Sequence, residues 1–103
     1  MTTFSEILAS LESSDHIQKI ELLDIKGSAA GTIENKPGSQ GSVKVYHHLY
    51  KKYGSISVAA AREGLEIYAE HTGDAEANPG KHPNIDRLFE IIRNEQPLNV
   101  NII

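Results

Sequence analysis

The sequence has 103 residues, a length that predicts one domain with one core over residues 1–103. It contains no cysteine, which excludes disulfides, thiolate zinc sites and cysteine nucleophiles. A formal net charge of −4 argues against nucleic acid as a partner, because phosphate binding usually needs a basic surplus. The start of the sequence lacks the pattern of a signal peptide, and no apolar run approaches the roughly 20 residues of a membrane helix. We therefore expect a cytoplasmic protein with neither a nucleic-acid nor a membrane partner.

The first predicted element is a short amphipathic helix that ends near the segment from Ser13 to Asp15. Its apolar residues recur at helical spacing, at Phe4, Ile7, Leu8 and Leu11. Thr3 can cap this helix, and Glu6 three residues later completes a capping-box pattern.

A hairpin is predicted next. The apolar run from Ile20 to Ile25 is too short for a helix, and Lys26-Gly27 is a turn signal. Residues 29–34 form the returning strand, which we expect to be short or bulged because alanine and glycine are poor strand formers.

A glycine-rich loop, Lys36 to Ser42, leads into a helix over residues 42–53 with Gly54 as its C-cap. On a helical wheel one side carries Val43, Tyr46, Leu49, Tyr50 and Tyr53, which we expect to be buried. The other side carries a basic stripe, Lys44, His47, His48 and Lys51.

Two more helices and a strand complete the chain. A helix is predicted from Val58 to about His71, in which Gly64 permits a close helix crossing. A polar loop, Gly73 to Asn84, precedes a helix that starts at Pro83. That helix buries Ile85, Leu88, Phe89 and Ile92 and exposes Asp86, Arg87, Glu90 and Arg93. Apolar and polar residues then alternate from Leu98 to Ile102, as in a half-buried strand.

Together these elements predict an α+β fold in the order α-β-β-α-α-α-β. Because three strands are the least that make a stable sheet, the last strand must join the hairpin. We expect a small three-stranded antiparallel sheet with the helices packed on one face.

Several long strings resemble a small family of uncharacterised bacterial proteins. They are PGSQGS (37–42), VYHHLYKKYG (45–54), AAREGLEIYAEHT (60–72) and ANPGKHPNIDRL (77–88). The resemblance covers nearly the whole chain and implies a bacterial cytoplasmic protein of about this size. It implies no activity, substrate or catalytic residue.

The candidate ligand-binding residues lie in the two polar loops and on the basic stripe. Glycines and a helix N-terminus suit an anion, although the loop lacks the Walker spacing, and a plain connection explains it as well. A solvated helix face likewise explains the stripe. The candidates are Lys36, Ser39, Gln40, Lys44, His47, His48, Lys51, Lys81 and His82.

A divalent metal is a weaker alternative. His71, Asp74, His82 and Asp86 converge only if the loop from residue 73 to 84 folds back, and hydrogen bonding explains the histidines without a metal. We assign no catalytic residue and expect no cofactor. Glu63, Glu66 and Glu70 are expected on an exposed face with untuned pKa values.

The leading hypothesis is a non-enzymatic binding or regulatory module that contacts a small anionic ligand or an acidic protein surface. The alternatives are a metal-dependent hydrolase that uses the His/Asp cluster, and a homodimer that pairs through a sheet edge. The sequence leaves monomer and homodimer open.

Overall fold

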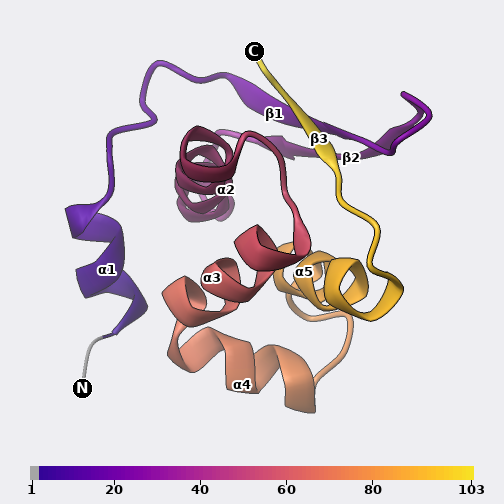
Figure 1. Cartoon of the computed structure of the whole chain (residues 1–103). Coiled ribbons are helices and arrows are strands. Elements are labelled where there is room, and N and C mark those ends of the chain that lie inside the picture. Colours follow the sequence, from indigo (N-terminus) through magenta and orange to yellow (C-terminus); the bar gives the residue numbers. More distant parts are fainter. Residues whose placement is uncertain (1–2) are drawn as a thin grey trace.

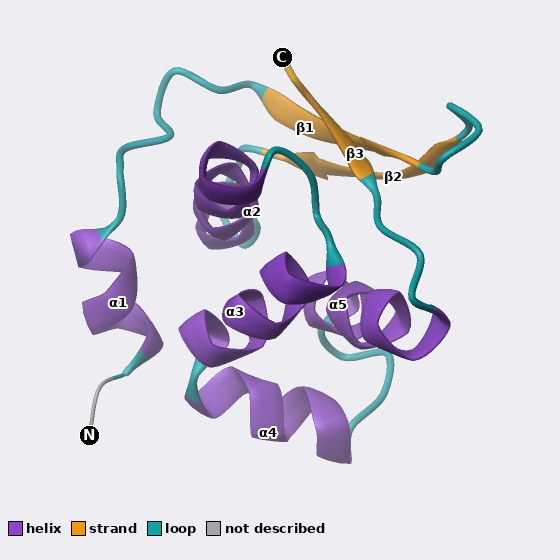
Figure 2. Ribbon diagram, in the orientation of Figure 1, coloured by secondary structure: helices purple, strands orange, loops and turns teal. Residues whose placement is uncertain are grey.

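The computed structural model describes residues 3–103 and places a three-stranded antiparallel sheet on one side of five helices (Figures 1 and 2). The α+β fold and the antiparallel sheet predicted from the sequence are confirmed. The elements in chain order are α1 (Phe4–Ser10), β1 (Lys19–Leu23), β2 (Ala29–Glu34), α2 (Gln40–Tyr53), α3 (Val58–Tyr68), α4 (Glu70–Ala77), α5 (Pro83–Asn94) and β3 (Asn99–Ile102).

The sheet has the strand order β2-β1-β3, so the last strand joins the hairpin as predicted. β1 alternates strictly: Ile20 and Leu22 are fully buried toward the helices, while Glu21 lies on the other face and accepts a 2.9 Å hydrogen bond from Asn101 of β3. The pairing of β1 with β2 shifts register between Leu22 and Leu23, which confirms the predicted bulge.

The hairpin turn follows the sequence signal. Gly27 adopts φ +86°, and the Asp24 carboxylate accepts hydrogen bonds from the N–H groups of Lys26 and Ser28, both at 2.9 Å. In Figure 1 this turn projects beyond the helices.

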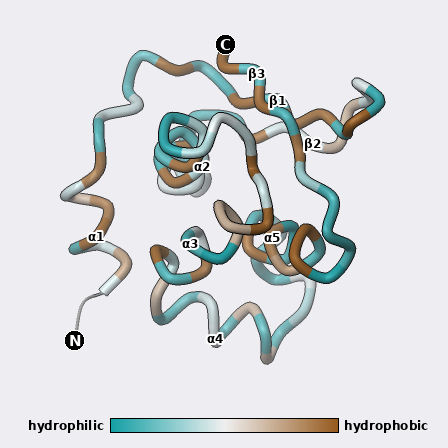
Figure 3. Tube along the Cα trace, viewed as in Figure 1, coloured by the Kyte–Doolittle hydropathy of each residue, from teal (hydrophilic) through white to brown (hydrophobic). Residues whose placement is uncertain are grey.

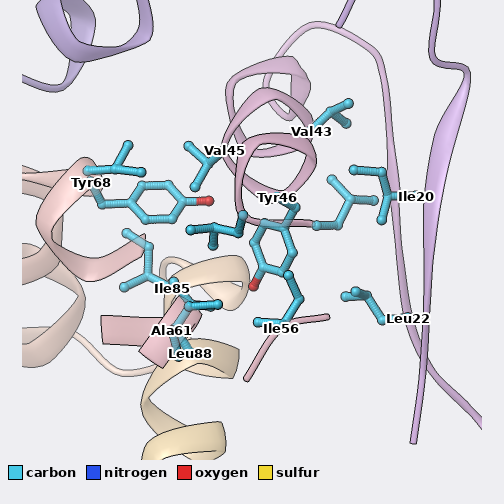
Figure 4. Packing of buried hydrophobic residues seen from close by; sticks show 14 of the residues in the cluster. Ile20, Leu22, Val43, Val45, Tyr46, Ile56, Ala61, Tyr68, Ile85 and Leu88 are labelled. Carbon is cyan, nitrogen blue, oxygen red and sulfur yellow. The ribbon is translucent and has the colours of Figure 1, made fainter. Parts of the chain in front are cut away.

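α2 lies directly beneath the sheet, and its side chains form the centre of the core (Figure 4). Apolar and polar residues are interleaved along it in Figure 3, as an amphipathic helix requires. The buried arc is wider than predicted and contains Val43, Val45, Tyr46, His47 and Leu49. Tyr53, predicted to be buried, is 36% exposed, because the helix end passes the edge of the core. Gly54 caps the helix at φ +81°, as predicted.

α3 crosses α5 at Gly64, as predicted. A Cβ atom at Gly64 would lie 2.7 Å from Leu88 Cδ1 and 3.1 Å from Leu49 Cδ1, both of which belong to fully buried side chains. The absence of a side chain at this position therefore sets the distance between the two helices.

The helix predicted from Val58 to His71 is wrong at its end, and so is the loop predicted from Gly73. α3 stops at Tyr68, Ala69 turns the chain at φ 50°, and α4 continues to Ala77. The Thr72 hydroxyl donates a 2.5 Å hydrogen bond to the carbonyl of Leu65, which supports the break. The turn brings Ala75 of α4 into the core.

α1 packs across the start of α2 and the end of α3. The Thr3 hydroxyl caps it by accepting the Glu6 N–H at 3.3 Å, as the capping pattern predicts. Phe4 stacks on Tyr68, with ring centroids 5.1 Å apart, and its N–H donates to the Glu70 carboxylate at 2.8 Å.

None of the helices within residues 3–103 has the length and apolar character needed to cross a membrane.

Two glycine-to-alanine changes test the helix crossing. Gly64→Ala should lower the free energy of unfolding by about 1–3 kcal/mol, because the new methyl overlaps Leu88 in a packed core. Gly73→Ala is the matched control, since nothing lies within 4 Å of its Cβ position in α4. It should stabilise the protein by about 0.5–1 kcal/mol through helix propensity. Urea unfolding of wild type and both variants measures these changes in the free energy of unfolding. A Gly64→Ala protein as stable as the Gly73→Ala protein would contradict the packing argument.

Candidate functional site

A cavity of about 520 Å³ lies between the start of α2 and the start of α5. Two polar segments far apart in the sequence line it together, the loop Gly38–Ser42 and the pair Lys81-His82. The structure therefore brings together four of the predicted ligand-binding residues: Ser39, Gln40, Lys81 and His82.

The N-terminus of α2 forms one wall of this cavity. Ser39 occupies the N-cap position, but its hydroxyl donates to the Glu34 carbonyl at 2.5 Å instead of capping the helix. The first turn, Gln40 to Ser42, is uncharged. Within residues 3–103 the N–H groups of Gly41 and Ser42 have no acceptor. Free amide hydrogens at the positive end of a helix dipole suit an anion.

Charged side chains from the α4–α5 connection form a second wall. His82 Nε2 donates to Asp74 Oδ2 at 2.6 Å, and Lys81 Nζ pairs with the same oxygen at 3.0 Å. The hydrogen bonds from His82 and then Lys81 lower the pKa of Asp74 to about 2. Asp74 is thus ionised at neutral pH, and it orients the His82 ring.

Aromatic rings close the base of the cavity. Phe4 lies against Tyr68 and, edge to face, against His71 at 5.1 Å, and the His71 ring lies 5.8 Å from the ring of His82. The Tyr68 hydroxyl donates to Ser42 Oγ at 2.7 Å. Sequence reasoning missed Phe4 and Tyr68 as lining residues, because their periodicity indicates only core packing.

Three predicted lysines lie away from this cavity. Lys36 is exposed and pairs with Glu34 at 3.0 Å. Lys44 lines a separate cavity of about 370 Å³ between α1 and α2, which Gln40 also lines. Lys51 is exposed in the last turn of α2.

His48 does not belong to a solvated stripe. Its Nε2 donates to Glu63 at 2.7 Å, and Lys52 and Tyr53 contact the other oxygen of that carboxylate at 2.6 and 2.8 Å. The expectation that Glu63 is exposed with an untuned pKa is therefore wrong, since its side chain is 19% exposed. Burial opposes ionisation, but the three hydrogen bonds outweigh it and lower the pKa of Glu63 to about 2. This cluster joins α2 to α3.

His47, also placed on the exposed stripe, is buried instead, with 5% of its surface accessible. Its ring packs edge to face against His16, with centroids 5.6 Å apart. Among the buried side-chain atoms of residues 3–103, His47 Nδ1 alone has no hydrogen-bond partner. Burial lowers the pKa of His47, so the folded state favours the neutral ring.

The four residues of the metal alternative are only partly brought together. Asp74 and His82 are in contact and His71 lies beside them, but Asp86 instead accepts the Gly80 N–H at 2.9 Å. Within residues 3–103 no group of three or more histidine, aspartate or glutamate side chains is arranged to hold a metal ion.

The fold and this cavity define a small α+β protein with a pocket between two helix N-termini, lined by polar segments and by aromatic rings. The model of a family described as an uncharacterised protein conserved in bacteria (DUF2322) matches residues 4–102, so the chain belongs to that family. No curated protein and no solved structure matches the chain.

Buried His47 predicts a pH dependence of stability. Its pKa is lower in the folded state than the ordinary 6.5, so the unfolded state binds the extra proton. The free energy of unfolding should therefore fall as the pH drops below about 6.5, until the lowered pKa is reached. His47→Leu should flatten this part of the profile in urea titrations between neutral and mildly acidic pH. His71→Gln in α4 is the control and should keep the slope, because His71 is not among the groups that act on the pKa of His47. Equal slopes in wild type and His47→Leu would refute the assignment.

Proposed function

We propose that this protein is a non-enzymatic binding module whose ligand is a small anion, most simply a phosphate group, held in the cavity between α2 and α5. One observation carries the proposal: the uncapped start of α2 and the Lys81-His82 pair line the same cavity. A cavity of about 520 Å³ falls within the ordinary range for small-molecule sites.

Two kinds of group favour an anion there. The Gly41 and Ser42 N–H groups supply oriented donors, and Lys81 supplies a positive charge. Asp74 holds Lys81 and His82 at the cavity before a ligand arrives, which lowers the cost of ordering them.

We also propose that the protein acts in the cytoplasm. The sequence contains no cysteine, whereas small secreted domains often depend on disulfides.

A single added charge tests the anion site. Gln40→Glu is an isosteric change at an exposed residue in the first turn of α2. The new carboxylate should occupy the positive helix end, stabilise the fold by about 0.3–1 kcal/mol and weaken phosphate binding by about fivefold or more. Amide NMR titrations with inorganic phosphate and with AMP measure binding, and shifts are expected at Gly38–Ser42 and at Lys81-His82.

Gln18→Glu is the matched control, because Gln18 is exposed and is not among the residues that line this cavity. It adds the same charge to the protein and should leave binding unchanged. Two results would defeat the proposal: no shifts at either segment with phosphate or AMP at about 10 mM, or equal affinity of the two variants.

A further inference from the structure

A second cavity, of about 440 Å³, lies between the hairpin, α5 and the connection from α5 to β3. These three segments lie on the same side of the molecule in Figure 1. The cavity differs from the proposed anion site in its chemistry, since groups of both charges and apolar groups line it. The lining residues include Asp24, Ile25, Arg87, Glu90, Ile91 and Leu98.

Arg87 is the positive group, and it is not on the exposed face to which the sequence assigned it. It is half-buried, with its guanidinium 5.8 Å from the centre of the Tyr46 ring. Its Nη1 donates to Asn84 Oδ1 at 2.8 Å and, more weakly, to the Tyr46 hydroxyl at 3.4 Å.

Gly31 of β2 leaves the space that the guanidinium occupies, because a Cβ there would lie 2.8 Å from Nη2. These contacts fix Arg87 in one orientation. Its Nε and Nη2 have no hydrogen-bond acceptor within residues 3–103.

The nearby carboxylates do not neutralise Arg87. Asp24 accepts hydrogen bonds from the hairpin turn, and Asp86 turns back to the Gly80 N–H. Glu90 lies one helical turn after Arg87, a spacing at which arginine and glutamate commonly pair. Arg87 nevertheless forms no ion pair within residues 3–103, since Asn84 and Tyr46 hold it on the other side. The cavity thus presents one fixed positive group and three carboxylates, of which Glu90 alone accepts no hydrogen bond within residues 3–103.

We propose that this cavity binds a zwitterionic α-amino acid with an apolar side chain. The ligand carboxylate pairs with the free donors of Arg87, a geometry in which arginine binds carboxylates strongly. The ligand ammonium pairs with Glu90, and the side chain contacts Ile25, Ile91 and Leu98. Ile25, which is 69% exposed without a ligand, gains apolar cover in the complex. The site is independent of the anion cavity, so either can fail alone.

Amide NMR titration of the intact chain with L-leucine tests the proposal, using 4-methylpentanoate and isoamylamine as probes that each lack one charge of leucine. Saturable shifts are expected at Ala30, Glu90 and Asn94 with leucine, and at least tenfold weaker binding with either single-charge probe. Glu90→Gln, a change at an exposed side chain, should weaken leucine binding about tenfold. Glu76→Gln on α4, at an exposed carboxylate outside the cavity, should leave it unchanged.

Arg87→Lys keeps the charge but loses the planar pair of donors, and it should weaken binding further, with urea unfolding reporting whether the fold survives. The proposal is overturned if none of the twenty common L-amino acids at about 10 mM shifts these residues. It is also overturned if 4-methylpentanoate binds as well as leucine, or if Glu90→Gln and Glu76→Gln bind alike.

Discussion

The buried Tyr46 side chain is the contact on which most of the structure depends. Its ring fills the centre of the core, between the sheet and α5 (Figure 4), and its hydroxyl donates a 2.6 Å hydrogen bond to the Asn84 carbonyl. Burial raises the pKa of Tyr46 to about 12, so the hydroxyl remains a donor at any physiological pH. A buried phenol without a partner would cost folding free energy. The first turn of α5 must therefore lie against α2.

This one bond places both cavities. Asn84 lines the proposed anion cavity and, through its side chain, holds Arg87, which lines the second cavity. Pro83 lines both. The two surfaces therefore lie on opposite sides of one helix start, and the tyrosine that anchors this start orients the cationic group of the second cavity. A change at Tyr46 would disturb both sites together, whereas Gln40 and Glu90 each belong to one site.

Local signals in the sequence predicted the elements well. The Lys26-Gly27 turn, the Gly54 cap and the Gly64 crossing each follow from a residue type that only one backbone or packing arrangement suits. The break at Ala69 could not be predicted in this way, because no glycine or proline marks it. Tertiary contacts stabilise it instead: the Thr72 hydroxyl bonds back to Leu65, and Tyr68 packs on Phe4.

The site was predictable only in parts. Loop composition identified residues 38–42 and 81–82 as separate candidates, and their meeting depends on a contact between Tyr46 and Asn84, 38 positions apart in the chain. The helical wheel gave the side of α2 on which His47 lies, but it wrongly predicted that this side is exposed. A wheel cannot show that the segment around His16 covers that side. Arg87 was misassigned for the same reason: its burial depends on the space left by Gly31 of the distant strand.

Asp74 bears on the kind of anion that we propose for the first cavity. Its ionised carboxylate shares one oxygen between the His82 ring and Lys81, so a ligand would compete with it for both groups. A monoanion such as acetate carries the same carboxylate group as Asp74, so it would gain little by displacing Asp74 from Lys81. A phosphate dianion brings additional charge and a third oxygen, which the free N–H groups of α2 can bind while Lys81 turns toward it. Because the Lys81 side chain is exposed, this exchange requires no movement of the backbone. If the first cavity is the anion site that we propose, phosphate is favoured over carboxylate by charge and by donor number.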